Sequence, residues 1–149
     1  MRSVVQRVRS ASVSVHGDEI GRIGVGLCAF VGVGVNDTDA DARVLADKIA
    51  ELRVFEDEQG KMNRSVLELG AEVLMVSQFT LYGDTRRGRR PSFTMAMEPQ
   101  GAASLFETCC QHLLGRGIRI ATGRFRAEML VQIANDGPVT LLIDTAKQF

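Results

Sequence analysis

Two short polar segments adjoin strongly apolar β runs, and their residue types could hold a reacting group with backbone atoms. The run Val73–Val76 leads directly into Ser77, Gln78, Phe79 and Thr80. The segment Asn135–Pro138 lies between two aliphatic, β-branched runs at 131–133 and 139–143. Its Gly-Pro unit is rigid because proline fixes φ and lacks an N–H, so the unit can direct carbonyl oxygens at a ligand. The same composition is also that of an ordinary hairpin turn.

Side chains suited to acid–base or metal chemistry are scarce. The sequence has two histidines, His16 and His112, and it contains no G-x-S-x-G elbow, H-E-x-x-H pair or P-loop. Acids at 37–41 begin like a calcium loop, but Ala42 and Lys48 replace the glycine and glutamate that such a loop requires. We therefore expect no metal and no cofactor. A site of this kind would stabilise a developing oxyanion with backbone N–H groups at a strand end.

The composition indicates one domain. With 149 residues, 45% of them hydrophobic, the chain can bury a core of its own. The formal net charge is zero, so any contact with nucleic acid must come from a local patch. Three cysteines without C-x-x-C spacing argue against a disulfide framework and a zinc site. No export signal or membrane-spanning segment is indicated, which favours a cytoplasmic protein.

Hydrophobic periodicity places the two polar segments on an α+β framework. Strands are expected at 1–15, 20–23, 24–35, 73–80, 118–120, 125–133 and 139–143. Amphipathic helices are expected after the acids at 37–41, with Leu45 and Ile49 on the apolar face, and from Pro99 to Leu113. Gly24–Ala29 matches a dinucleotide fingerprint, but another apolar run follows it instead of a helix. We predict a single domain, 1–149, with a mostly antiparallel or mixed, barrel-like sheet and two main helices packed on it.

An arginine-rich segment follows the first polar segment. Arg86, Arg87, Arg89 and Arg90 place four guanidinium groups within five residues. One interpretation is a solvated surface loop. The alternative is that these arginines neutralise phosphates of a bound nucleic acid, since the segment lies immediately after Ser77–Thr80.

Further motifs accompany the two polar segments in a fixed order. They are Met1–Val15, Gly60–Asn63, Arg90–Phe93 and Thr122–Phe125, together with Ser77–Leu81 and Asn135–Thr140. In this order the motifs resemble the D-aminoacyl-tRNA deacylase family over essentially the whole chain. The resemblance implies a deacylase-type fold and an enzyme that hydrolyses the ester of D-aminoacyl-tRNA, with glycyl-tRNA as a further substrate.

The resemblance also implies a role for each polar segment. Backbone groups of Ser77–Thr80 would face the scissile ester, and the terminal adenosine would stack near Phe79. The Gly137-Pro138 unit would be cis and would enter the partner's pocket in a homodimer, where its carbonyls hold the substrate α-amino group. An L side chain would clash with this wall, whereas a D side chain would point to open space. Arg7 would steady the Gly-Pro unit; on sequence alone it could equally be a surface arginine.

Other residues follow from the same resemblance. Phe125 and Met129 would line the substrate pocket. The charge and position of Arg86, Arg87 and Arg89, rather than the resemblance, indicate that they contact the tRNA. The 2′-hydroxyl of the tRNA terminus would assist hydrolysis, so Thr80 would support the site without being the nucleophile. Arg126 departs from the family, which usually has a small residue after Thr-Gly-x-Phe, and this departure bears on the shape of the pocket.

Two alternatives to this function remain. The first is the paralogous editing enzyme for L-alanyl-tRNA, which has Pro-Gln-Ala-Thr where this chain has Ser77–Thr80 and lacks a counterpart of Arg7. The second is a non-enzymatic nucleic-acid-binding protein; DNA-binding relatives of this fold carry a C-terminal extension, whereas five residues follow Asp144 here. Release of D-tyrosine or L-tyrosine from tRNA would distinguish these hypotheses.

Overall fold

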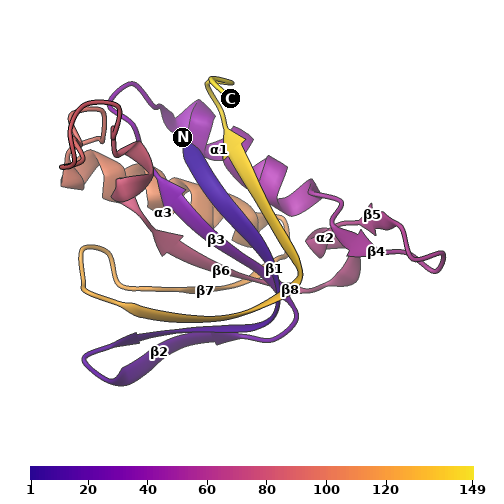
Figure 1. The fold of residues 1–149 in the computed structure, drawn as a ribbon. Coiled ribbons are helices and arrows are strands. Elements are labelled where there is room, and N and C mark those ends of the chain that lie inside the picture. The colour runs from indigo at the N-terminus through magenta and orange to yellow at the C-terminus, as the bar shows by residue number, and fades with distance from the viewer.

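A six-stranded mixed sheet organises the chain, and the computed structural model describes every residue from Met1 to Phe149. Its strands are β1 (Arg2–Val15), β2 (Asp18–Ile23), β3 (Gly26–Gly32), β6 (Glu72–Ser77), β7 (Arg119–Thr122) and β8 (Leu130–Asp144). β1 pairs antiparallel with β2, β3 and β8, while β6 runs parallel to both β3 and β7. The helices α1 (Asp39–Glu51) and α3 (Pro99–Gly115) lie side by side on one face of this sheet (Figure 1).

Four short elements complete the chain. β4 (Phe55–Glu56) and β5 (Met62–Arg64) form a small hairpin that projects from the body, and α2 (Val66–Leu69) follows it (Figure 1). The 3₁₀ turn η1 (Phe79–Tyr82) comes directly after β6. None of the helices is both long and apolar enough to span a lipid bilayer.

β3 and β6 are apolar along their whole length because both of their faces are covered. Alternate side chains of a strand point to opposite faces, and in β3 Leu27 and Ala29 belong to the core beneath the helices, while Cys28 belongs to a second apolar cluster on the other face. Parallel strands buried on both faces have this continuous hydrophobic pattern. This packing confirms a strand within the predicted segment 24–35, although β3 begins only at Gly26 and ends at Gly32, and it excludes a dinucleotide-binding turn.

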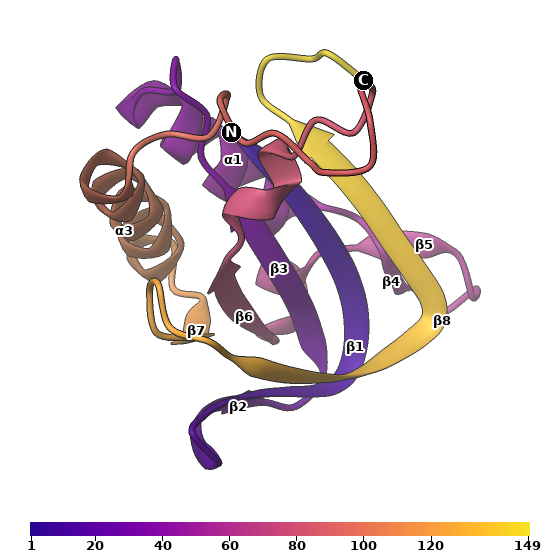
Figure 2. The ribbon, with the colours of Figure 1, turned by 60° about the vertical axis from the view of Figure 1, so that its left-hand side comes forward.

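The sheet curls until its two edges come close. β1 is long enough to pair with β3 through its first half and with β2 through its second half, and β8 runs along both halves. β2 thereby reaches β7, where a Cβ placed on Gly21 would lie 2.9 Å from the carbonyl oxygen of Thr122. Figure 2 shows the curled course of the sheet. The second apolar cluster comes from its strands, with Val8, Ala11 and Val13 of β1, Ile23 of β2, Cys28 of β3, and Leu74 and Val76 of β6. The predicted barrel-like, mixed sheet is thus confirmed.

The two long helices have the predicted positions and recognisable start signals. Thr38 and Asp41 form a capping box at the start of α1, and Asp39 adds a second acid to the first turn. In α3 the side chain of Glu98 accepts hydrogen bonds from the first free N–H groups, and Pro99 occupies the first turn. Leu45, Ile49 and other apolar residues of these helices are buried against the sheet.

Three details of the predicted framework were wrong. The strand expected at 73–80 ends at Ser77, because the chain turns there into η1. The strand expected from residue 125 begins only at Leu130, after a turn. Asn135–Pro138 is no hairpin corner, since β8 continues through it and pairs with the same strand, β1, on both sides.

We expect Gly26→Ala to lower the free energy of unfolding by about 3 kcal/mol, the upper end of the usual overpacking cost. A Cβ on Gly26 would lie 1.9 Å from the carbonyl oxygen of Glu72, so β3 and β6 would have to separate. The midpoint of urea unfolding measures the effect. Gly115→Ala is the matched control, because no atom lies within 4 Å of its added Cβ. Equal midpoints for the two variants would contradict the close approach of β3 and β6.

Candidate active site

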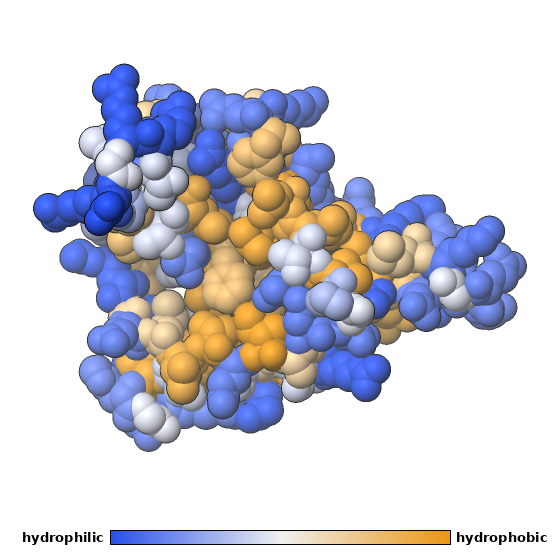
Figure 3. Space-filling model, in the orientation of Figure 1, coloured by the Kyte–Doolittle hydropathy of each residue, from blue (hydrophilic) through white to orange (hydrophobic).

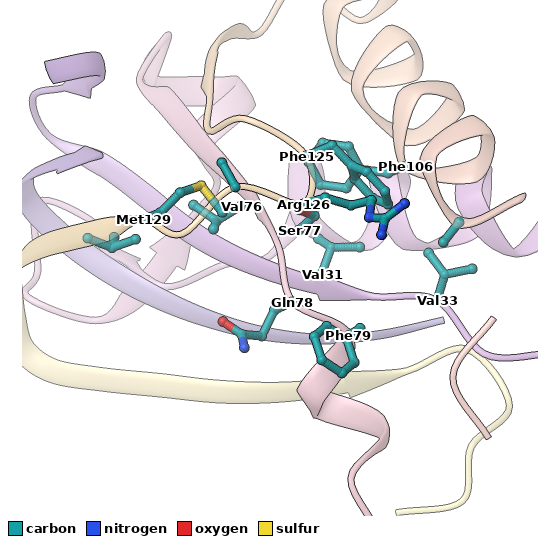
Figure 4. Close-up of a pocket in the computed structure, with 13 residues that line it drawn as sticks. Val31, Val33, Val76, Ser77, Gln78, Phe79, Phe106, Phe125, Arg126 and Met129 are labelled. Atoms are coloured by element: carbon teal, nitrogen blue, oxygen red, sulfur yellow. The ribbon is translucent and has the colours of Figure 1, made fainter. Parts of the chain in front are cut away.

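An apolar cavity of about 290 Å³ opens at the end of β6, between η1, α3 and the segment that leads into β8. Ten of its 13 lining residues are hydrophobic. Phe79 and Gln78 lie on one side, Phe125, Phe106 and Arg126 on the other, and Met129 with Val76 at one end (Figure 4). Cavities with apolar walls and few polar groups are the usual form of small-ligand sites.

The Ser77–Thr80 segment forms one rim of this cavity. The N–H of Gln78 donates to the carbonyl of Val31 (2.7 Å), which fixes the end of β6 against β3. The chain then enters η1, and the N–H groups of Phe79 and Thr80 open this turn without an acceptor inside it. These two N–H groups make no backbone hydrogen bond elsewhere in the chain, and Phe79 itself lines the cavity.

Glycines of the strand beneath let η1 lie this close. A Cβ on Gly32 would be 2.9 Å from the carbonyl oxygen of Gln78, and one on Gly34 would be 2.6 Å from the ring of Tyr82. The Tyr82 hydroxyl donates to Asp37 (3.0 Å), which holds the end of η1 in place. The positions of the Phe79 and Thr80 N–H groups thus depend on residues outside the Ser77–Thr80 segment.

The opposite rim is a tight turn between β7 and β8. The N–H of Gly123 donates to the carbonyl of Met75 (3.2 Å), and a Cβ on Gly123 would meet the sulfur of Met129 at 2.5 Å. Phe125 packs against Phe106 of α3 with 6.4 Å between ring centroids. Phe125 and Met129 therefore both line the cavity, and Arg126 lies between them in the sequence with a positive φ of 65°.

The side chains near the cavity offer no activated nucleophile. Thr80 is exposed and accepts a hydrogen bond from the side chain of Gln78. His112 lies 2.8 Å from Asp47, between α3 and α1, and His16 is in the β1–β2 turn, so neither lines the cavity. No group of three His, Cys, Asp or Glu side chains is placed to hold a metal ion.

The three cysteines are also inert. Burial raises the pKa of the Cys28, Cys109 and Cys110 thiols to about 12 each, so none is a thiolate near neutral pH. Cys109 and Cys110 are buried residues of α3. The cysteines therefore supply no thiolate nucleophile to the cavity.

The Gly137-Pro138 unit lies in a large bulge of β8. On either side of the bulge, Gln6 pairs with Thr140 and Val8 pairs with Asn135. Between these pairs β1 has one residue, Arg7, where β8 has the four residues 136–139. The Asn135 side chain bridges the base of the bulge by accepting from the N–H of Val139 (3.4 Å) and donating to Thr140 (3.2 Å). The Gly137-Pro138 bond is cis, and both residues are exposed.

Arg7 supports this bulge from below and is no surface arginine. Only 9% of the residue is exposed, and its guanidinium donates to the carbonyl of Val54 at 2.6 Å and to the carbonyl of Asp136 at 3.2 Å. Gly137 comes directly after Asp136, and a Cβ placed on it would be 3.0 Å from a terminal nitrogen of Arg7. The arginine and the Gly-Pro unit are therefore packed together.

The structure does not bring all of the predicted site residues together within one chain. Gly137, Pro138 and Arg7 do not line the cavity that Ser77–Thr80 borders. The arginines lie on an exposed loop whose base is closed by backbone hydrogen bonds between Asp84 and Ser92 (2.7 and 2.9 Å). This loop returns to the cavity at Phe93, whose ring packs edge-on against Phe79 at 5.0 Å.

Comparison with known proteins agrees with this geometry. A sequence model of the family described as D-Tyr-tRNA(Tyr) deacylase matches residues 4–144. The chain belongs to this deacylase family. Members of the family are hydrolases, so this chain is an enzyme of that class. A D-aminoacyl-tRNA deacylase of Desulfitobacterium hafniense (strain DSM 10664 / DCB-2) is 58% identical over 149 residues, which is the full length of both chains.

Other relatives of this deacylase chain match over nearly the same length. A D-aminoacyl-tRNA deacylase of Heliobacterium modesticaldum is 58% identical over 144 residues, 97% of this chain and 96% of the relative. The solved structure of a protein named c-Myc DNA Unwinding Element Binding Protein has a TM-score of 0.92 and 41% identity, covering 97% of this chain and 99% of that chain. A probable eukaryotic D-amino acid tRNA deacylase, with a TM-score of 0.82 and 17% identity over 95% and 97% of the two chains, shares the fold.

Several cavity residues of this deacylase were missed at the sequence level. They are Val31, Val33, Ala102, Phe106, Ala127 and Val131. All are small or apolar residues in segments that the periodicity assigned to a core. Their local sequence pattern therefore could not distinguish residues that line a cavity from residues packed in the core. The structural role of Asn135 could have been predicted from the sequence, because asparagine side chains hydrogen-bond to nearby backbone groups at irregular turns.

Proposed function

We propose that this protein hydrolyses the ester bond of D-aminoacyl-tRNA, giving free D-amino acid and tRNA. The observation that carries the proposal is the pair of backbone N–H groups at Phe79 and Thr80, which open η1 at the rim of the apolar cavity. Such donors stabilise the oxyanion that forms when water attacks an ester carbonyl. An aminoacyl ester is already activated, so the scarcity of acid–base side chains is consistent with this reaction.

The terminal adenosine of the tRNA is proposed to occupy the cavity. Its base would lie against Phe79, which is 57% exposed although its other side packs on Phe93. Stacking of a nucleobase on an aromatic ring is typically worth about 1–3 kcal/mol. This placement would put the ribose and its ester at the rim, beside Ser77 and Thr80. The 2′-hydroxyl would then be close enough to assist the attacking water.

Chiral selection is proposed to require a second copy of the chain. The bulge with Gly137 and Pro138 projects from β8 and lies outside its own cavity. β8 pairs only with β1, and its Leu130, Leu141 and Leu142 are exposed. Figure 3 shows that apolar residues gather around a hollow on one face of the molecule. A free edge with exposed apolar side chains is typical of a protein interface.

In the proposed dimer, each Gly-Pro bulge enters the partner's cavity and forms a wall at the ester. Its carbonyls would hold the substrate α-amino group, while Arg7 keeps the bulge in position from beneath. The wall would exclude an L side chain and leave room for a D side chain. Glycyl-tRNA is proposed as a further substrate, because glycine has no side chain for the wall to exclude.

Release of tyrosine from D-Tyr-tRNA tests the proposed function directly. We expect rapid release of D-tyrosine and slow release of L-tyrosine. The competing function is nucleic-acid binding without hydrolysis, which is suggested by the name of the DNA-binding relative at 41% identity. Binding of tRNA or DNA with no release of D-tyrosine would favour that competing function. Preferential hydrolysis of L-alanyl-tRNA would favour the editing paralogue.

The arginine loop is proposed to contact tRNA phosphates. Arg86 is already held by Asp84, to which it donates twice (2.9 and 2.7 Å), and this contact lowers the pKa of the Asp84 carboxyl. Arg87 and Arg89 are exposed. We therefore expect Arg87 and Arg89 to contribute more to tRNA binding than Arg86.

Replacing Arg86, Arg87 and Arg89 by alanine should weaken tRNA binding and leave the D/L preference unchanged. The slope of log affinity against log salt should flatten by about 0.7–0.9 for each phosphate that is no longer neutralised. Filter binding at several salt concentrations measures this slope. Arg22→Ala is the control, since Arg22 is paired with Glu19 on β2. An unchanged slope in the triple variant would make the segment an ordinary solvated loop.

A further inference from the structure

Arg126 is the one charged residue among the 13 that line the cavity. It lies beside Phe125 and Phe106, on the side opposite Gln78 and Phe79 (Figure 4). The residue is exposed, and its guanidinium takes part in none of the hydrogen bonds or ion pairs within the chain. An arginine at the rim of an apolar cavity is therefore free to bind a group on the ligand.

The backbone at Arg126 is held in a conformation that disfavours a side chain. Its φ is 65°, within the left-handed region that glycine adopts most easily. The turn is closed by a hydrogen bond from the N–H of Ala127 to the carbonyl of Arg124 (3.2 Å). Strained backbone conformations of this kind cluster at ligand sites, and of the three non-glycine residues with positive φ, His16, Arg126 and Lys147, only Arg126 lines the cavity.

The chemistry of guanidinium identifies the group that it would bind. A planar guanidinium matches the oxygens of a phosphate and forms charge-assisted hydrogen bonds with it. A terminal adenosine in the cavity carries one phosphate, on its 5′ side, and this phosphate must leave the apolar walls toward the rim where the chain of the tRNA continues. Arg126 is the charged group that the cavity offers to this phosphate.

We propose that Arg126 binds the phosphate on the 5′ side of the terminal adenosine. This inference rests on the proposed function, because it assumes that the adenosine occupies the cavity. Arg126 would then be a positioning residue that sets the affinity for the tRNA end and places the ester at the rim. It would contribute little to the choice between D and L substrates, because the phosphate and the amino acid lie at opposite ends of the nucleoside.

Binding of adenosine 5′-monophosphate and of adenosine, measured by calorimetry, tests the inference without any hydrolysis. We expect the monophosphate to bind the wild-type protein about tenfold more tightly than adenosine, as one charge-assisted contact predicts. Arg126→Gln should abolish most of this advantage. Arg124→Gln is the matched control, because it removes an equal charge two residues away from a side chain that does not line the cavity. An equal advantage in both variants would overturn the inference.

Steady-state kinetics with D-Tyr-tRNA provide the second measurement. Arg126→Gln should raise KM about tenfold with a smaller change in kcat and an unchanged D/L preference, which is the pattern of weakened binding. Arg126→Gly should raise KM equally while raising the midpoint of thermal unfolding, since glycine relieves the backbone at φ 65°. A lowered midpoint with reduced activity would instead indicate a structural role and overturn the inference.

Two further outcomes separate the inference from its alternatives. If Arg126→Gln slows release from D-Asp-tRNA but not from D-Asn-tRNA, the arginine binds an acidic side chain and the phosphate assignment is wrong. If the wild-type protein binds the monophosphate through Arg126 yet releases no D-tyrosine, the proposed hydrolysis fails while the phosphate contact stands.

Discussion

The wild-type protein is expected to release D-tyrosine from tRNA about a thousandfold faster than L-tyrosine. This ratio corresponds to about 4 kcal/mol, since each 1.4 kcal/mol is tenfold. In the proposed dimer this free-energy penalty on the L substrate arises because the Gly137-Pro138 bulge occupies the space where an L side chain would project. Rates of deacylation for the two enantiomers on the same tRNA measure the ratio. Equal rates would contradict selection by exclusion.

Gly137→Ala tests which element makes this wall. Gly137 has a φ of 121°, and a Cβ there would lie 2.9 Å from a methyl group of Val139 and 3.0 Å from Arg7. The bulge would have to shift to accommodate this Cβ. We therefore expect the ratio of the D rate to the L rate to fall at least about tenfold, which corresponds to a loss of about 1.4 kcal/mol of discrimination. The rate on the D substrate should also fall, because the same carbonyls are proposed to hold its amino group.

Gly17→Ala is the matched control for this variant. Gly17 also has a positive φ, 85°, but no atom lies within 4 Å of an added Cβ, and it is in the turn between β1 and β2. It should cost stability through the same kind of backbone strain and leave the D/L ratio unchanged. If both glycine variants lose selectivity equally, loss of stability explains the effect and the wall assignment is wrong.

Removing the terminal 2′-hydroxyl of the tRNA is expected to slow hydrolysis at least about a hundredfold, within the range of 10²–10⁴ for positioned proton transfer. Thr80→Ala should slow it less than about tenfold, far below that range. The Thr80 hydroxyl accepts a hydrogen bond from Gln78, and no histidine, carboxylate or thiolate lies beside it to take its proton. An unassisted threonine hydroxyl is a weak nucleophile.

Single-turnover rates on ribo- and 2′-deoxy-terminated D-Tyr-tRNA measure the two effects separately from product release. Thr85→Ala serves as a control, since Thr85 is an exposed threonine outside the cavity. A covalent acyl group trapped on Thr80 would restore threonine as the nucleophile. So would full activity on the 2′-deoxy substrate together with an inactive Thr80→Ala protein.

The sequence predicted the long elements well because their patterns are local. The acids and apolar stripe of α1 and the Pro99 start of α3 depend on residues within a few turns of each other. The helix α2 was missed, although Ser65 and Glu68 form a capping box, because four residues show no periodicity. The end of β6 at Ser77 was also missed, because the close approach of η1 depends on Gly32 and Gly34 of a distant strand.

For the site, the motifs named candidate residues but could not predict how they are arranged. Ser77, Gln78, Phe79, Phe125 and Met129 line one cavity, and Arg7 hydrogen-bonds to the carbonyl of Asp136, next to Gly137. The bulge itself could not be predicted, because it depends on the register between β1 and β8, which come from opposite ends of the chain. Arg126 was visible only as a departure from the family, since its backbone conformation and lack of partners are properties of the folded turn.

The pairing of β1 with β8 has a consequence for how the chain reaches this state. These strands are the first and the last in the sequence, yet β8 pairs with β1 along nearly the whole length of both strands. Folding rates fall as contacts become less local, because two distant segments lose conformational entropy before the contacts between them form and offset that loss. During synthesis, β1 emerges first and cannot complete its pairing until β8 has been made. The Gly-Pro bulge is therefore among the last features of the protein to form, and a nascent chain would carry neither the wall nor the selectivity proposed to depend on it.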